Sequence, residues 1–201
     1  MKTLLLWAAV AAVAIVHAAG GLRVDVRGLR SARIREIAAR PPLSWQYFPQ
    51  YLGTEKESSA VMISSPLGAD WRRFEFSFVP ENDGRFTLSF HVQGVRRQVV
   101  PALVDDIQVS GAVLKNGGFE TAEEGRPAHW RQGKAAALVT DGSAAEGKNC
   151  MRVAFRSGTV SQQISVSAGQ PVTVSFLARL ADPVSATEDI VHEPQPSGGK
   201  K

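Results

Sequence analysis

Two aromatic residues, Trp45 and Tyr47, stand two positions apart in a polar and aromatic stretch that covers residues 43–57. Sugars present apolar C–H faces that pack on aromatic rings, and nearby polar side chains then bind the hydroxyl groups. The composition of 43–57 predicts a long loop, so Trp45 and Tyr47 are a candidate platform for a sugar. Trp130 is a second candidate, with a core position as its alternative, and Gln162 is a candidate hydrogen-bond partner.

Residues with catalytic spacing are harder to find. The sequence contains no Gly-x-Ser-x-Gly, no His-Glu-x-x-His and no phosphate-binding loop motif, and His91, His129 and His192 show no metal-site spacing. Glycoside hydrolysis needs two carboxylates that flank a cleft. The adjacent Glu123 and Glu124 are the only obvious pair, and neighbours on a polar loop are usually solvated. We therefore expect no enzyme activity; a glycosidase is the alternative that two facing carboxylates would support.

The elements that must position these residues are short strands. Asp83-Gly84 and Asp141-Gly142 are favoured turn signals, and similar turns separate most of the apolar stretches. Residues 33–39 are ambiguous between helix and strand. Many short strands with no convincing helix predict an all-β fold, an antiparallel β-sandwich. The predicted strands are residues 22–28, 60–64, 71–79, 85–93, 103–109, 135–140, 149–155, 159–166 and 172–180.

Residues 103–120 contain two motifs in series. Val-Asp-Asp-Ile occupies positions 104–107 within a predicted strand, and Asn-Gly-Gly-Phe-Glu occupies positions 116–120. These motifs resemble the galactose-binding-like jelly rolls, the carbohydrate-binding modules of families four, nine, sixteen and twenty-two. The resemblance implies a jelly-roll sandwich that binds a polysaccharide or oligosaccharide. In that family the Asn-Gly-Gly-Phe-Glu motif opens a module and Asp-Asp-Ile closes one, so this chain has the closing motif first.

This inverted order predicts a circular permutation. Residues 112–181 follow the first part of such a module and lack its closing strands, which residues 20–111 supply. Neither half alone buries its apolar face, because an isolated partial sheet leaves that face in water. We therefore expect residues 20–181 to form one permuted β-sandwich with halves 20–111 and 112–181. The alternative is a gene fragment, or two half-modules that fold poorly.

The resemblance also implies a structural calcium ion. In the family, the Glu of the opening motif and an Asp of the closing strand bind calcium together with main-chain carbonyl oxygens, and hard calcium prefers such oxygen ligands. Carried over to this chain, the ligands are Asp106, Glu120 and the carbonyl of Lys148. Asp105 points opposite Asp106 in a regular strand, so the register decides which of the two serves. The alternative is that these carboxylates are solvated and bind no metal.

The two ends of the chain carry targeting and low-complexity signals. Residues 1–18 combine a Lys, an apolar run and a small-residue cleavage site, which predicts a signal peptide and a secreted or periplasmic bacterial protein without a membrane anchor after cleavage. An uncleaved N-terminal anchor is the alternative. Residues 182–201 are rich in Pro, Ser, Glu, Gly and Lys and predict a disordered tail.

The net charge and the cysteine content restrict the binding partners and the chemistry that we expect. The net charge of +4 is mild and the basic residues are scattered, so we expect no nucleic-acid binding. The single cysteine, Cys150, lies in a strand-like run and is expected to be a buried, inert thiol. The sequence leaves the oligomeric state open. The expected function is non-catalytic carbohydrate binding, and the alternative is a cell-surface structural or protein-interaction sandwich.

Overall fold

The computed structural model describes residues 21–28, 34–39, 43–48, 58–63, 67–93 and 100–181. The predicted signal peptide at 1–18 and the predicted tail at 182–201 lie outside these residues. Within the described ranges every regular element is a β-strand, and no helix there has the length and apolarity to cross a membrane. The prediction of an all-β fold is therefore confirmed.

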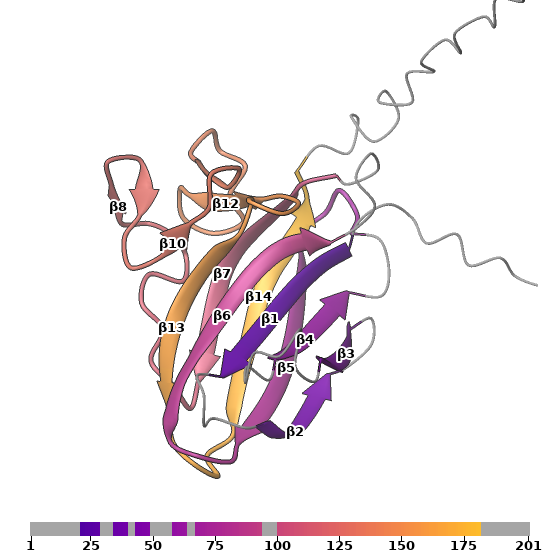
Figure 1. The fold of residues 1–201 in the computed structure, drawn as a ribbon. Coiled ribbons are helices and arrows are strands. Elements are labelled where there is room, and N and C mark those ends of the chain that lie inside the picture. Colours follow the sequence, from indigo (N-terminus) through magenta and orange to yellow (C-terminus); the bar gives the residue numbers. More distant parts are fainter. Residues whose placement is uncertain are drawn as a thin grey trace, which may run out of the picture.

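Two six-stranded antiparallel sheets form the layers of a sandwich (Figure 1). The first sheet has the spatial order β10 (Arg131–Gln132), β13 (Val160–Val166), β6 (Gly84–Gln93), β1 (Gly21–Gly28), β4 (Ser58–Ile63) and β3 (Leu43–Phe48). The second has the order β11 (Ala137–Val139), β12 (Cys150–Val153), β7 (Ala102–Ser110), β14 (Val172–Leu180), β5 (Arg72–Pro80) and β2 (Ile34–Ala39). A two-stranded ribbon joins β8 (Ala122–Glu123) to β9 (Arg126–Pro127).

One hydrophobic core lies between the sheets, built by the alternation of apolar and polar residues along each strand. Aromatic rings connect the layers. Phe90 of β6 meets Phe176 of β14 edge to face at 5.2 Å between ring centroids, and Phe78 of β5 lies 5.7 Å from Phe86 of β6. Such aromatic pairs contribute roughly 0.5–1.5 kcal/mol each beyond the burial of their area.

Strands from both parts of the chain share each sheet. In the first sheet β13 pairs with β6, so Val160 lies opposite Phe90 and Val166 opposite Gly84. In the second, β14 lies between β7 and β5 and is paired with both. These pairings join strands that are far apart in sequence. The circular permutation itself, a relation to other proteins, stays a prediction.

Two segments differ from the sequence-based expectation. Residues 34–39, which the pattern left ambiguous, form β2 at the edge of the second sheet. Residues 43–48, predicted to begin a long loop, form β3 at the edge of the first sheet and pair with β4. The local strand signal was present, because Leu43, Trp45 and Tyr47 alternate with polar residues and aromatic residues favour strands. The segment is short, and the polar residues that follow it made the whole stretch resemble a loop.

Candidate functional site

The two motifs of residues 103–120 meet in the structure. The N–H of Ile107 in β7 donates to the carbonyl oxygen of Gly117, 3.1 Å away. A Cβ atom at position 117 would come within 1.9 Å of the Ile107 carbonyl oxygen, so only glycine permits this approach. The opening motif therefore packs directly on the closing strand.

A β-bulge in β7 sends Asp105 and Asp106 to different surroundings. The pairing of β7 with β14 shifts register between Ser175 and Leu177, and Asp106 has a positive φ of 42°. A bulge places one extra residue on its strand and redirects the side chains around it. As a result Asp105 and Ile107 are both buried, whereas Asp106 is partly exposed between them.

The carboxylate of Asp105 binds the main chain of the loop that contains residues 145 and 146. Its side chain is 0% exposed, and its Oδ2 accepts hydrogen bonds from the main-chain N–H groups of Ala145 and Glu146 at 2.8 and 3.0 Å. Its Oδ1 accepts the N–H of Asp106 at 2.7 Å. Burial raises the pKa of Asp105 above its ordinary value, and the three N–H groups oppose this shift in part. The buried carboxylate is thus an anchor for residues 145 and 146.

Glu120, the last residue of the opening motif, contacts the same loop as Asp105. Its Oε1 accepts the N–H groups of Lys148 and Asn149 at 2.9 and 3.0 Å. Between the two anchored pairs stands Gly147, with a φ of 63°, where a Cβ atom would come within 2.4 Å of Oε1 of Glu120. We call residues 145–149, together with Asp105 and Glu120, the carboxylate-anchored loop.

Asp106, the residue assigned to calcium from the sequence, points elsewhere. Its carboxylate forms an ion pair with Arg73 of β5 and accepts hydrogen bonds from Nε2 of Gln108 at 3.0 and 2.9 Å. Its partial burial raises the pKa, but the bonds from Gln108 and Arg73 outweigh this and hold the pKa of Asp106 below its ordinary value. The structure therefore places Asp105, and not Asp106, against the loop that Glu120 also contacts. A calcium-binding role for Asp106 stays a prediction.

The oxygen atoms near the carboxylate-anchored loop suit calcium in type. Both N–H donors to Glu120 reach Oε1, and its Oε2 receives no hydrogen bond from a described residue. Within the ranges that the structure describes, no three His, Cys, Asp or Glu side chains cluster in a way that could hold a metal. A calcium ion here would therefore depend on two carboxylates, Asp105 and Glu120, and on main-chain carbonyl oxygens such as that of Lys148.

Trp130 is a core residue, the second of the two positions that the sequence allowed. It is 7% exposed, and its ring lies 5.2 Å from Phe119 and 6.5 Å from Phe90 between centroids. Its Nε1–H donates to the carbonyl oxygen of Asn116 at 2.9 Å. The indole therefore fixes the opening motif to the core and presents no free face to a sugar.

Trp45 and Tyr47 lie in β3 rather than in a loop. In register, Trp45 is opposite Val61, which is opposite Val24; Tyr47 is opposite Ser59, which pairs with Val26. The side chains of Trp45 and Tyr47 lie outside the described part of the structure. Their role as a sugar platform stays a prediction, now for an edge strand.

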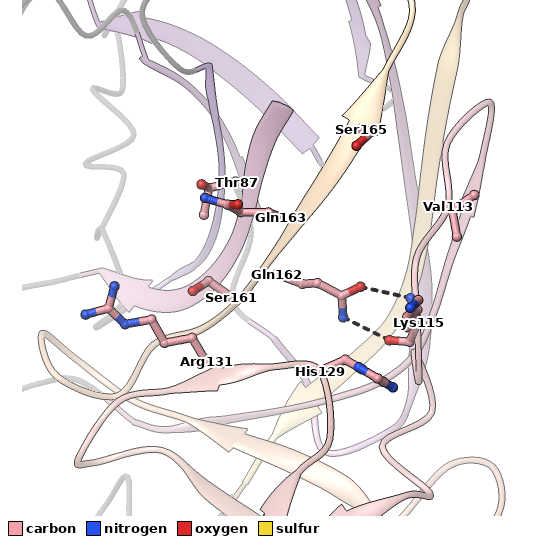
Figure 2. A pocket seen from close by; sticks show the side chains of 9 residues that line it. All are labelled: Thr87, Val113, Lys115, His129, Arg131, Ser161, Gln162, Gln163 and Ser165. Atoms are coloured by element: carbon pink, nitrogen blue, oxygen red, sulfur yellow. Dashed lines mark hydrogen bonds between the residues drawn. The ribbon is translucent and has the colours of Figure 1, made fainter. Parts of the chain in front are cut away.

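A groove of about 610 Å³ runs over β13 at the other edge of the first sheet (Figure 2). Figure 2 shows Thr87, Ser161, Gln163 and Arg131 on one flank of β13, and Gln162, Lys115, His129 and Val113 on the other. The lining side chains are hydroxyls, amides and bases with one valine: Thr87, Val113, Lys115, His129, Arg131, Ser161, Gln162, Gln163 and Ser165.

Gln162 lines this groove and also builds it. The side chain is 8% exposed; its Oε1 accepts the N–H of Lys115 at 2.8 Å, and its Nε2 donates to the carbonyl oxygen of Lys115 at 2.9 Å. This two-bond clamp fixes the segment around Lys115 to the strand. Gln162 therefore lines the groove, and two of its four possible hydrogen bonds are made within the protein. Its contact with a sugar stays a prediction.

Of the nine residues that line the groove, Gln162 is a binding candidate from the sequence, whereas residues such as Thr87, Lys115, Ser161 and Arg131 are not. The outward positions of β13 carried the available signal, because Ser161, Gln163 and Ser165 are all polar and alternate with buried residues. Such alternation is ordinary for any half-exposed strand, so it does not single out a binding surface. Thr87 of β6 and Arg131 of β10 come next to β13 only through the pairing of the strands, which the sequence does not show.

The remaining chemical candidates lie apart from the groove lining. Glu123 and Glu124 are exposed on the ribbon of β8 and β9 and do not line the groove. Cys150 is a buried free thiol, and burial raises its pKa to about 12, which makes it a poor nucleophile at neutral pH. The expectation of a buried, unreactive cysteine agrees with this position.

Compared with known proteins, the chain matches no family model and no curated protein.

Proposed function

We propose that the protein is a non-catalytic carbohydrate-binding β-sandwich of the galactose-binding-like jelly-roll type, and that a glycan binds in the groove over β13. The observation that carries the proposal is the lining of this groove, in which hydroxyl and amide side chains predominate. The volume of about 610 Å³ is within the range of about 300–1,000 Å³ that is usual for ligand sites. Such a surface offers both donors and acceptors, as a chain of sugar hydroxyls requires.

The outward side chains of β13 set the spacing of these groups. Ser161, Gln163 and Ser165 follow each other at every second position, which puts neighbours about 6.6–6.8 Å apart along the strand. Thr87 of β6 lies opposite Gln163 and widens the polar strip by one strand. No Phe, Tyr or Trp is among the lining residues, so we propose hydrogen bonding rather than stacking as the main contact, with correspondingly weak affinity.

The first test is affinity electrophoresis of the protein against a panel of soluble polysaccharides, followed by calorimetric titration of those that retard it. We expect Gln163→Ala to weaken binding by about tenfold, because an exposed amide is lost from the centre of the strip. Glu75→Gln, on an exposed position of β5 in the other sheet, is the matched control and should bind normally. A folded protein that no polysaccharide retards would contradict the proposal and favour the structural or protein-interaction alternative.

We also propose a structural calcium ion at the carboxylate-anchored loop, held by Asp105 and Glu120 with main-chain carbonyl oxygens. Calcium that binds only the native state raises the apparent stability by mass action. Thermal unfolding should therefore shift upward in calcium and downward in chelator, and Glu120→Gln should abolish the difference. Unfolding that is indifferent to chelator in the wild-type protein would remove the metal and leave the N–H bonds as the only anchor.

Export from the cell, predicted from residues 1–18, belongs to the same proposal. A secreted or periplasmic location would bring the groove to polysaccharides outside the cytoplasm. Mass spectrometry of the protein exported by a bacterial host would show cleavage after residue 18, whereas an intact leader in the membrane fraction would show an uncleaved anchor.

A further inference from the structure

The charged side chains that line the groove are all of one sign. Three of its lining residues carry or can carry positive charge, namely Lys115, His129 and Arg131, and none of the lining residues is an Asp or Glu. All three are exposed. Among the described residues, no carboxylate forms an ion pair with any of these three side chains. The positive charge is therefore available to a ligand.

The main chain is fixed at each of the three basic residues. Lys115 is clamped through its N–H and carbonyl by the side chain of Gln162. Arg131 belongs to β10 and lies opposite Ser161 of β13. His129 has a φ of 70° and stands between the buried residues Ala128 and Trp130. A non-glycine residue in this left-handed region is uncommon and is kept there by its surroundings.

The bases stand on both flanks of β13. Arg131 lies on the same flank as Ser161 and Gln163, whereas Lys115 and His129 lie on the opposite flank (Figure 2). A polymer that follows or crosses the strand thus meets hydrogen-bonding groups in the middle and positive charge on each side. Arg and Lys both bind carboxylates well, Arg through its planar fork and Lys as a point charge.

From this arrangement we infer that the groove selects acidic polysaccharides, with Lys115, His129 and Arg131 binding the carboxylates of uronic acid residues. This inference rests on the proposed carbohydrate binding and adds the class of glycan. Single-stranded nucleic acid is a weaker match, because its binding sites stack successive bases on several aromatic rings and the groove lining has no Phe, Tyr or Trp. Hydroxyl and amide groups between the bases suit a sugar chain better.

The test compares four polymers of known charge. Calorimetric titration of the full-length protein uses polygalacturonate, its methyl-esterified form, dextran sulfate and single-stranded DNA. Because esterification removes the charge and keeps the sugar, we expect polygalacturonate to bind at least tenfold more tightly than the ester. The double variant Lys115→Met and Arg131→Met should lose about tenfold in affinity for polygalacturonate and little for the ester. Lys134→Met, an exposed lysine outside the groove lining, removes one charge as a control.

The outcomes distinguish a failure of the selection of acidic glycans from a failure of carbohydrate binding itself. Equal binding of polygalacturonate and its ester would overturn the selection of acidic glycans and leave carbohydrate binding intact. Stronger binding of dextran sulfate than of polygalacturonate, or equal binding of single-stranded DNA, would show general attraction to polyanions and overturn the assignment to uronic acids. No binding of any of these polymers, nor of the neutral panel, would overturn both proposals. Circular dichroism of each variant checks that the sandwich is intact.

Discussion

The carboxylate-anchored loop and the groove over β13 are both rich in polar groups, and they use them in opposite ways. At the loop, Asp105 and Glu120 point their oxygen atoms at main-chain N–H groups 2.8–3.0 Å away. In the groove, Lys115 and Arg131 present charged ends that pair with no carboxylate of the described residues. The carboxylates of the loop bond to N–H groups of the protein itself, whereas the charged ends of Lys115 and Arg131 are open to a ligand.

The difference distinguishes polar groups that stabilise the fold from polar groups that can bind a ligand. A buried carboxylate that lost its N–H partners would leave several polar groups unpaired, at a cost of about 1–3 kcal/mol for each one. An exposed base has no such cost, because water solvates it until a ligand arrives. Substitutions of Asp105 or Glu120 should therefore change stability, and those of the exposed groove residues Lys115, Arg131 and Gln163 should change binding alone.

The largest effect is expected at Asp105. Asp105→Ala removes the acceptor for three main-chain N–H groups, two of them in the loop, and should lower the free energy of unfolding by roughly 3 kcal/mol. Urea denaturation followed by fluorescence measures this change. Arg131→Ala in the groove should stay within about 0.5 kcal/mol of the wild-type protein. Similar losses for both variants would contradict the division between the two regions.

A smaller effect is expected at Gly147. Gly147→Ala forces a Cβ atom against the carboxylate of Glu120 and strains a positive φ, so we expect a loss of about 2 kcal/mol. Gly125→Ala is the matched control, since Gly125 has a φ of 74° and open space around it. Thermal denaturation of the two variants isolates the contact with Glu120. Equal losses would mean that Glu120 moves aside and that its contact with the loop is weak.

The smallest effect concerns Asp106, whose ion pair with Arg73 is partly exposed. Its pKa is lower in the folded protein than the ordinary 3.8, so its ionised form stabilises the fold above that pH. Asp106→Asn should therefore cost about 0.5 kcal/mol at neutral pH, and the difference from the wild-type protein should vanish as the pH falls through the folded pKa. Urea titrations at pH 7 and below pH 3 give both values. A difference that grows in acid would contradict this sign.

Periodicity carried most of the fold prediction. The alternating phenylalanines of β5 and β6 predicted two half-buried strands, and the structure has both. Composition misled at β3, because a short edge strand with Trp45 and Tyr47 resembles an aromatic loop. The pairing of β3 with β4 is a long-range property that the local sequence does not contain.

The site could be predicted only in part. The resemblance named Glu120 and Asp106 and left the choice between Asp105 and Asp106 to the register; in the structure Asp105 and Glu120 contact the same loop. The bulge that directs Asp105 to this loop arises from the pairing of β7 with β14, so no pattern within β7 shows it. The groove was missed for a similar reason, since Thr87, Lys115 and Arg131 come together only through the sheet.

The most direct test of glycan binding in the groove is to map the main-chain amide shifts by NMR while trigalacturonate is added. We predict that the largest shifts fall on Ser161, Gln163 and Ser165 and on Thr87 of the neighbouring strand, with little change at residues 145–149. Shifts that centre on β3, or no shifts at millimolar ligand, would contradict the account.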